Sequence, residues 1–308
     1  KEDVEAILTP DWDILRYVRV IKQSYDFGFD SIDALIDDLE TGLKTFNTRL
    51  DYNLNLAFDG RSVVGDNPED LQDRAYGDND VRARHGRSHG THVSGIIAAK
   101  RHNGIGINGA ANRVKIMAIR NTPSGDEYDK DVALGVYYAV DNGAKVINMS
   151  FGKQFSPHSN WVRDAIAYAA KNDVLIVAAA GNDAQNTDEI NYFPNDQINN
   201  GEEVSNTFLK VGSIGPKYGS TMVASYSNYG KNTVDVFAPG SEIYSTYPKE
   251  SYEFASGTSM AAPLVSGVAA LVFSQYPSLS AAQVKQLLVS SGIPINKKVS
   301  LENGAVVP

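Results

Sequence analysis

Short apolar runs alternate with helix-like stretches from about residue 86 onward, and this alternation limits the fold more than any other feature of the sequence. The apolar runs lie at 114–119, 145–149, 174–180 and 234–237, and the helix-like stretches lie at 89–101, 129–142, 160–172 and 259–275. Unbroken apolar runs are typical of strands buried on both faces, and helices between them are typical of crossover connections. The sequence therefore predicts an α/β fold of three layers, a parallel sheet with helices on both faces.

The first fifty residues have a different pattern, with helical periodicity and no glycine-rich turns between strand and helix. Thr9, Pro10 and Asp11 suit a helix start, with Thr9 as the cap. Asp30 and Ser31 suit a second start, and apolar residues recur at three- and four-residue steps after each one. We expect residues 1–50 to form a helical hairpin, as an insertion or extension next to a domain at 51–308.

Composition excludes several classes of protein. The net charge is -9, and acidic residues are spread along the chain without a basic stripe, so we expect no nucleic-acid partner. The absence of cysteine excludes disulfides and thiolate catalysis but leaves the compartment open. We expect no membrane span, since no apolar run approaches the roughly 18 residues that a span needs.

Residues 51–84 are rich in Asp, Asn and Gly, as in 65–67 (GDN) and 77–80 (GDND). Such a composition predicts turns in which Asp and Asn side chains form hydrogen bonds with nearby backbone groups. Structural calcium is the alternative, although no full calcium-loop spacing is present.

A serine, Ser259, stands at the predicted start of the last long helix, within 256–263 (SGTSMAAP). Free backbone N–H groups at a helix start face any negative charge that develops there, and the small neighbours leave room for a substrate. For this serine alone, the alternative is a structural N-cap on a buried helix. Ser259 is therefore a candidate nucleophile that needs partners elsewhere in the chain.

A histidine, His89, stands at another predicted helix start, within 89–95 (HGTHVSG). Histidine is the usual general base at neutral pH, and a structural role is the alternative. A metal-dependent hydrolase is a third hypothesis, because His85, His89 and His92 are spaced four and three residues apart. That segment lacks the glutamate of a zinc-protease helix, and Gly86 and Gly90 weaken a helix between the histidines.

An amide, Asn182, follows the apolar run 174–180 and Gly181. A carboxamide at the carboxyl end of a parallel strand, beside a cleft floored by small residues, suits the stabilisation of an oxyanion. The alternative is a turn-forming asparagine.

Together these three segments resemble the motifs of the subtilase family of serine peptidases (peptidase S8), in the family's order, and the resemblance extends over about two thirds of the chain. It implies a serine endopeptidase in which Ser259 attacks the peptide carbonyl and His89 is the general base. Asn182 and the backbone N–H of Ser259 would hold the oxyanion. The implied substrates are proteins or peptides, and no cofactor takes part in the chemistry.

The resemblance also implies where a substrate lies. Residues 146–152 are similar to the family's strand that pairs with substrate, and 123–128 are similar to the start of the opposing edge strand, so that an extended peptide would bind between them by strand addition. The small residues 178–181 predict a roomy, neutral primary pocket, whereas Asp126 and Glu127 would favour basic residues further along the substrate. The implied substrate-binding residues are Ser124, Gly125, Ser150, Phe151, Gly152, Ala179, Ala180 and Gly181.

The family pattern also has an aspartate before the histidine, on an apolar strand that ends Asp-Ser/Thr-Gly, which orients the imidazole. Asp59 comes nearest to it, and Asp51, Asp66 and Asp70 lie in loop-like text. We therefore expect this aspartate and its strand upstream of Lys1, with residues 1–50 inserted between aspartate and histidine, similar to subtilases of Bacteroidetes type.

Two classes of function stay open at this stage. A serine endopeptidase is favoured, and the alternative is a subtilase-fold binding or regulatory module that no longer cleaves. The resemblance implies a secreted or cell-envelope location, although no basic-then-apolar signal segment opens the chain.

Overall fold

The computed structural model describes residues 7, 9–26, 28–29, 31–82, 88–122, 125–198, 201–295, 298–300 and 306–307. The chain divides into two compact units, Lys1–Gly65 and Asp66–Pro308, and each is described by itself. The sequence pattern predicts this boundary at residue 50.

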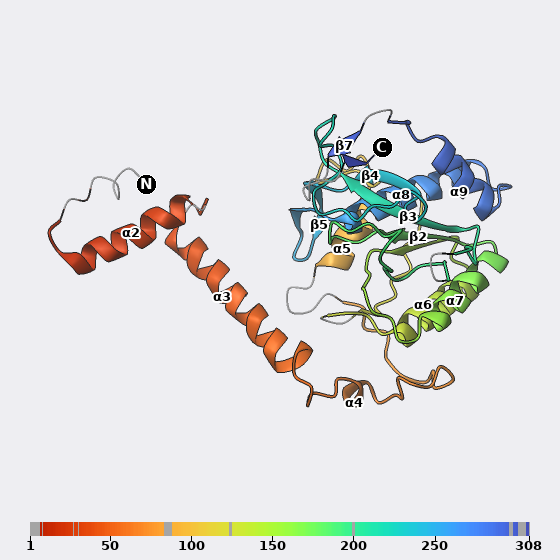
Figure 1. Ribbon diagram of the computed structural model, residues 1–308, viewed down its shortest axis with the longest axis horizontal. Helices are drawn as coiled ribbons and strands as arrows, with labels where there is room; N and C mark the ends of the chain where they lie inside the picture. The colour runs from red at the N-terminus through yellow and green to blue at the C-terminus, as the bar shows by residue number, and fades with distance from the viewer. Residues whose placement is uncertain are drawn as a thin grey trace. The chain divides into compact units, whose positions relative to one another are not determined.

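The first unit contains the helices α2 (Trp12–Asp26), α3 (Ile32–Thr48) and α4 (Arg61–Val64), with the π-helical turn η1 (Arg49–Asn53) directly after α3 (Figure 1). The predicted cap of α3 is confirmed, because the Ser31 hydroxyl accepts a hydrogen bond from the backbone N–H of Ala34 at 3.1 Å. At α2 the cap is Asp11 and not Thr9. The Asp11 carboxylate accepts from the N–H of Asp13 at 2.9 Å, since it lies directly before the first helical turn.

The second unit is built on a four-stranded parallel sheet in the order β1 (Val146–Met149), β2 (Leu175–Ala179), β3 (Phe208–Ile214) and β4 (Val236–Pro239). Every residue of β2 is buried, as the unbroken apolar run predicts. β3 has no clear strand signal in the sequence, because Lys210 interrupts its apolar run. The Lys210 side chain is nevertheless buried, and its ammonium donates to the carbonyl of Tyr192 at 3.1 Å.

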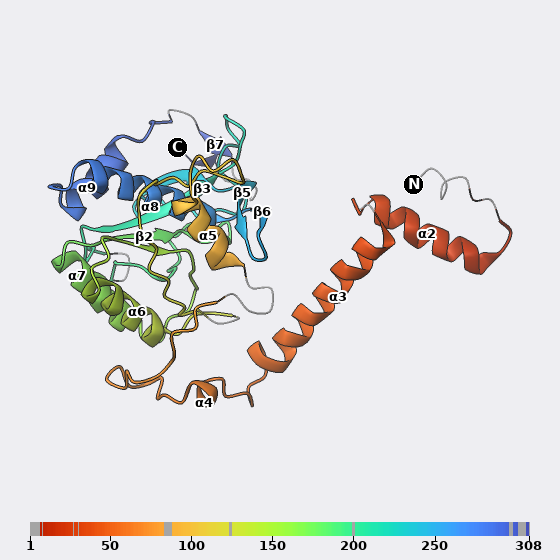
Figure 2. The same ribbon diagram turned by 180° about the vertical axis from the view of Figure 1, so that it is seen from behind.

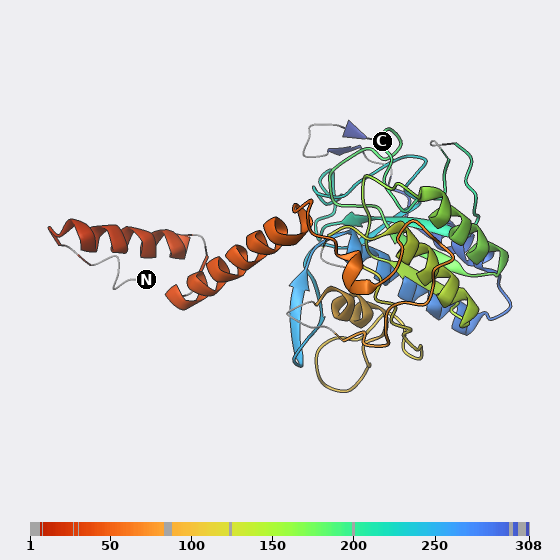
Figure 3. The same cartoon turned by 90° about the horizontal axis from the view of Figure 1, so that it is seen from below.

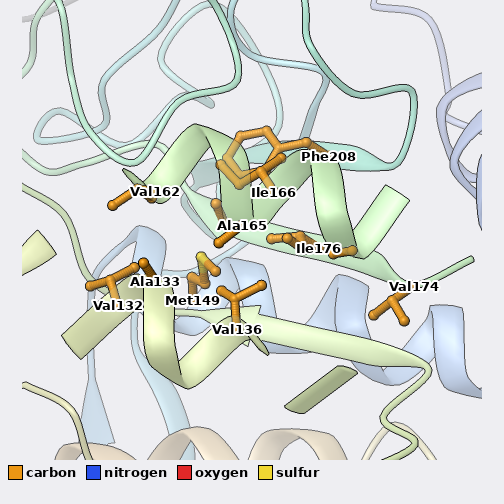
Figure 4. Close-up of a cluster of buried hydrophobic side chains, with 12 residues drawn as sticks. Val132, Ala133, Val136, Met149, Val162, Ala165, Ile166, Val174, Ile176 and Phe208 are labelled. Carbon is orange, nitrogen blue, oxygen red and sulfur yellow. The ribbon is translucent and has the colours of Figure 1, made fainter. Parts of the chain in front are cut away.

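Helices cover both faces of this sheet. Ile176 and Ala178 of β2 pack with α6 (Asp129–Asp141) and α7 (Ser159–Lys171), as Figure 4 shows for Ile176. The alternate residues, such as Val177, pack with α8 (Thr258–Gln275) and α9 (Ala281–Ser290). Figures 1 and 2 show the two helix pairs on opposite sides of the strands. Figure 3 shows the molecule from below, with the green pair, α6 and α7, toward the viewer. The predicted three-layer α/β fold is confirmed.

The helix α5 (His89–Ala98) packs against α8 and against β5 (Ile243–Tyr247), which pairs antiparallel with β6 (Ser251–Ala255). Glycine is needed at position 95, because a Cβ there would lie 2.1 Å from the Thr246 hydroxyl. That hydroxyl donates to the carbonyl of Thr91 at 2.9 Å, and the Ser245 hydroxyl donates to that of His92 at 2.7 Å. β5 therefore fixes the first turn of α5. The remaining pair of strands is β7 (Val299–Ser300) and β8 (Val306–Val307).

The predicted strand at 114–119 is wrong for the described structure. Residues 112–120 have no regular secondary structure, and the side chains of Ile116 and Met117 are 45% and 41% exposed. A strand requires a hydrogen-bonded neighbour, and in the part of the chain that is described β1 is the edge strand on its side of the sheet. An apolar run without such a neighbour therefore stays outside the sheet.

The turns predicted between residues 66 and 80 are confirmed. Asn67 and Asp78 each accept a hydrogen bond from the backbone N–H two residues later, at 3.1 and 2.8 Å. Asp66 instead forms a buried ion pair with Lys130 of α6, with 2.7 Å between Oδ2 and Nζ. Over the described residues, no group of three or more His, Asp or Glu side chains is arranged to hold a metal ion.

Within the described residues, α8 is the helix long and apolar enough to cross a membrane by length and composition. Half of it is buried inside the protein, and it packs against all four strands of the sheet. The core helix of a soluble protein meets the same criterion, so α8 is weak support for a span.

Candidate active site

Ser259 lies in the first turn of α8, at the carboxyl end of β1. Its hydroxyl donates to the carbonyl of Ser150 at 3.0 Å, and the Ser150 hydroxyl donates to the carbonyl of Ser259 at 2.8 Å. Asn148 of β1 continues this network, since its amide donates to the Ser150 hydroxyl at 2.9 Å and accepts from Ser266 of α8 at 2.9 Å. These bonds fix the start of α8 to the end of β1.

Asn182 lies beside Ser259 and is oriented by Thr258, the residue directly before that serine. The carboxamide oxygen of Asn182 accepts from both the N–H and the hydroxyl of Thr258, at 2.9 Å each. Thr258 is fully buried, and its hydroxyl also accepts from the N–H of Gly181 at 3.1 Å. Because the oxygen of Asn182 is engaged in this way, its NH₂ group is the end of the amide left to act as a donor.

The loop that carries Asn182 is held by hydrogen bonds to Asn228, a fully buried amide. Asn228 donates to the carbonyl of Ala180 at 3.0 Å and accepts from the N–H groups of Asp183 and Gln185 at 3.0 Å each. Gly181 has a φ of +105°, and a Cβ there would lie 2.2 Å from the Asn228 amide. Only glycine allows this close approach of loop and amide.

His89 is the first residue of α5, and part of the residue is exposed although its imidazole ring is largely surrounded by protein. Desolvation by the surrounding protein, and then the charge of His92, lower the pKa of the His89 imidazole from its ordinary value. Since α5 packs against α8, His89 and Ser259 begin neighbouring helices. In the described part of the chain, His89 has neither a hydrogen bond to Ser259 nor one to a carboxylate.

His92 belongs to the interior and not to the site. Its Nε2 lies 3.1 Å from the carbonyl oxygens of both Ile243 and Glu253, at the β5–β6 hairpin. An imidazole nitrogen engaged by two carbonyls is not available to a metal ion. The other ring nitrogen, Nδ1, is buried without a hydrogen-bond partner, but over the described residues no group of three or more His, Asp or Glu side chains is arranged to hold a metal ion. His85 lies outside the described residues.

A cavity of about 220 Å³ opens beside Ser259 and Asn182. Of the predicted substrate-binding residues, Ser150 is hydrogen-bonded to Ser259, Ala180 is fully buried and Ser124 lies outside the described residues. The others line the cavity directly: Gly125, Phe151, Gly152, Ala179 and Gly181.

Residues that the sequence analysis did not single out also line this cavity, Tyr192 and Thr258 among them. Thr258 lies inside the motif at 256–263, so its place next to the nucleophile was a usable signal. Tyr192 carries no such signal, because a loop brings it to Gly152 and Gly181. The cavity is also not neutral, since Asp126 and Glu127 line it together with the small residues.

The structure shows the local surroundings of the four aspartates that the sequence offered. Asp66 pairs with Lys130, and Asp70 accepts from the N–H of Gln72 at 2.8 Å in a turn. Asp59 accepts from the N–H of Arg61 at 3.0 Å, at the start of α4. Asp51 lies in η1.

A sequence model described as the subtilase family matches residues 33–304, which is most of the chain. The chain belongs to the subtilase family. The fold class and the class of enzyme predicted from the motifs, a serine-type endopeptidase, are thereby confirmed. The members of this family act on peptides or proteins and need no cofactor for catalysis.

Named relatives agree with this subtilase assignment. Thermitase of Thermoactinomyces vulgaris is 41% identical over 223 residues, which are 70% of this chain and 74% of thermitase. A cell wall-associated protease of Bacillus subtilis is 36% identical over 258 residues, which are 83% of this chain and 25% of that protein. The chain thus spans about a quarter of the length of this second relative.

A solved structure with the same fold is that of a cold-adapted subtilisin-like serine proteinase. It has a TM-score of 0.59 and 32% sequence identity to this subtilase, and the alignment covers 77% of each chain.

Proposed function

We propose that this subtilase hydrolyses peptide bonds with Ser259 as nucleophile, His89 as general base and Asn182 as oxyanion donor. The observation that carries the proposal is the pair of hydrogen bonds by which Thr258 holds the oxygen of Asn182. They leave the NH₂ group of Asn182 as the donor next to the cavity that Ser259 lines. Such a preorganised donor stabilises an oxyanion without reorganisation during the reaction.

In the proposed reaction the Ser259 hydroxyl turns from the carbonyl of Ser150 to the imidazole of His89. His89 takes the proton as Ser259 attacks the peptide carbonyl, and it returns the proton to the leaving amine. The oxyanion is held by Asn182 and by the N–H of Ser259, which lies among the free N–H groups of the first turn of α8. Water then releases the acyl group by the same steps in reverse.

The carboxylate that orients His89 is, in this proposal, carried by a strand that pairs with the free edge of β1. Two observations support this position: β1 is an edge strand of the described sheet, and the apolar run 114–119 has no strand partner there. The same proposal keeps residues 1–50 as a helical insertion and 51–308 as the catalytic domain.

We further infer a secreted or cell-envelope location, which is supported by the name of the cell wall-associated relative. The substrates would then be proteins or peptides outside the cell, with no nucleic-acid partner. A structural calcium ion remains part of the proposal for the complete protein, and loss of thermal stability on chelation is its test.

A fluorophosphonate probe tests the catalytic proposal, because it labels only a serine that a base activates. We expect stoichiometric labelling of Ser259 in the complete gene product, located by peptide mass spectrometry, and none in Ser259→Ala. A folded wild-type protein that stays unlabelled would establish the alternative, a subtilase-fold module that binds without cleaving.

A further inference from the structure

Acidic side chains dominate the charge of the cavity beside Ser259. Asp126 and Glu127 line it, and its described lining contains no lysine, arginine or histidine. A third carboxylate, Asp183, directly follows Asn182, and its charge helps to raise the pKa of Tyr192, which forms part of the wall. The fold therefore places two carboxylates in the lining of this cavity and a third next to Asn182.

Glu127 is the buried member of this group, with only 4% of its surface exposed. Burial is the main cause that raises its pKa, as expected for a carboxylate with little water around it. The nearest cation is Lys153, but its ammonium lies 2.9 Å from the Asp129 carboxylate and donates to the main-chain carbonyl of Glu127 at 2.5 Å. Lys153 is thus held by Asp129 and offsets the charge of Glu127 only in part.

The same carboxylates affect the pKa of Tyr192, which also lines the cavity. Burial, and then the charges of Asp183, Glu127 and Asp126, raise the pKa of its hydroxyl. The phenol is therefore neutral at any physiological pH. Its oxygen can accept a hydrogen bond from an ammonium or guanidinium group in the cavity.

We propose that Glu127 and Asp126 make this cavity a site for a cationic side chain, so that the enzyme cleaves after lysine or arginine. The proposal rests on the catalytic roles given above, because Ser259 and Asn182 bound the cavity and thus make its occupant the residue before the scissile bond. It replaces the neutral primary pocket that the small residues 178–181 predicted.

The shape of the cavity suits such a side chain. Phe151, Gly152 and Ala179 give apolar contacts to an aliphatic stem, and the charged head reaches carboxylates and the Tyr192 hydroxyl. A buried carboxylate without a full partner gains more from an incoming cation than an exposed one does. Glu127 is therefore the residue that determines specificity, and the exposed Asp126 adds a smaller, salt-sensitive contribution.

The test is a set of internally quenched peptides that differ only in the residue before the scissile bond, cleaved by the complete gene product. The informative pair is arginine and citrulline, because citrulline keeps the shape of arginine without its charge, and a leucine peptide is the internal reference. We expect kcat/KM for arginine to exceed that for citrulline by at least about tenfold. The arginine-to-leucine ratio should fall by about tenfold in Glu127→Gln and less in Asp126→Asn.

Glu202→Gln is the matched control, since Glu202 is an exposed carboxylate outside the cavity, and it should leave the arginine-to-leucine ratio unchanged. Equal cleavage of the arginine and citrulline peptides would overturn the proposal while leaving the endopeptidase function intact. So would a preference for arginine two or more residues before the scissile bond, with none directly before it. A protein that cleaves no peptide and is not labelled by fluorophosphonate would instead refute the proposed function. The arginine–citrulline comparison needs only wild-type protein, so it decides the matter even if Glu127→Gln does not fold.

Discussion

Thr258 holds the carboxamide oxygen of Asn182 with its backbone N–H and with its hydroxyl, at 2.9 Å each. The residue directly before the proposed nucleophile thus orients the proposed oxyanion donor. Thr258 is also the first residue of α8 and is fully buried, so it fixes the position of Asn182 relative to Ser259.

The first prediction concerns this donor. Asn182→Ala should lower kcat by about 10²–10³ with little change in KM, as loss of the corresponding donor does in subtilisin, because an oxyanion donor acts in the transition state. Steady-state kinetics on one peptide substrate measures this effect. Asn142→Ala is the control, since Asn142 is an exposed amide at the end of α6. A large rise in KM with unchanged kcat would assign Asn182 to substrate binding instead.

The second prediction concerns Asn228, whose side chain is hydrogen-bonded to the loop of Asn182. Asn228→Ala should lower the free energy of unfolding by roughly 2–4 kcal/mol, since it leaves the buried carbonyl of Ala180 and the partly buried N–H groups of Asp183 and Gln185 without their partner. Urea denaturation followed by circular dichroism measures the change. A loss below about 0.5 kcal/mol would mean that water replaces these bonds.

Sequence patterns predicted the elements whose burial is uniform. β2 was recognisable because all five of its residues are buried and apolar. β3 was not, because Lys210 interrupts its apolar run and its burial depends on partners distant in sequence, such as the carbonyl of Tyr192. The strand prediction for residues 114–119 is wrong for the opposite reason. It has the composition of a strand, but in the described chain it has no neighbour to pair with.

The site residues that could be predicted from the sequence are likewise those with a local signal. Ser259, His89 and Asn182 were found because they lie in contiguous motifs at helix starts and at a strand end. Tyr192 was missed because only the packing of its loop against Gly152 and Gly181 brings it to the cavity. The charge of the cavity was misjudged for a related reason: local sequence does not reveal that Glu127 and Ala179 line the same cavity.

The third prediction concerns stability and pH at Asp196, a buried carboxylate with an unpartnered Oδ2. Burial, and then the charge of Glu203, raise the pKa of Asp196 to about 7. Between about pH 4 and 7 the folded state therefore keeps a proton that the unfolded chain has released, so this group makes the free energy of unfolding fall as pH rises through that range. Asp196→Asn removes the loss, and its stability relative to wild type should increase by about 1–3 kcal/mol from about pH 4 to pH 8.

Urea denaturation at a series of pH values measures this difference. Asp78→Asn is the control, because Asp78 is exposed and its turn hydrogen bond is to a side-chain oxygen that asparagine retains. Parallel pH profiles for wild type and Asp196→Asn would show that Asp196 ionises in the folded state as it does in the unfolded chain.

The last prediction concerns His89, whose pKa is lowered from 6.5 by desolvation and then by His92, with no carboxylate among the described causes. In residues 1–308 produced alone, the imidazole should therefore titrate below pH 6.5, as followed by NMR with His89→Gln to assign the signal. A carboxylate on a strand that pairs with β1 would raise this pKa, because a negative neighbour favours the charged imidazole. The same strand should raise kcat by about 10⁴, the order of the loss when subtilisin lacks its aspartate. A His89 pKa above its ordinary value in residues 1–308 alone, together with full proteolysis, would mean that a carboxylate within this sequence already faces the ring.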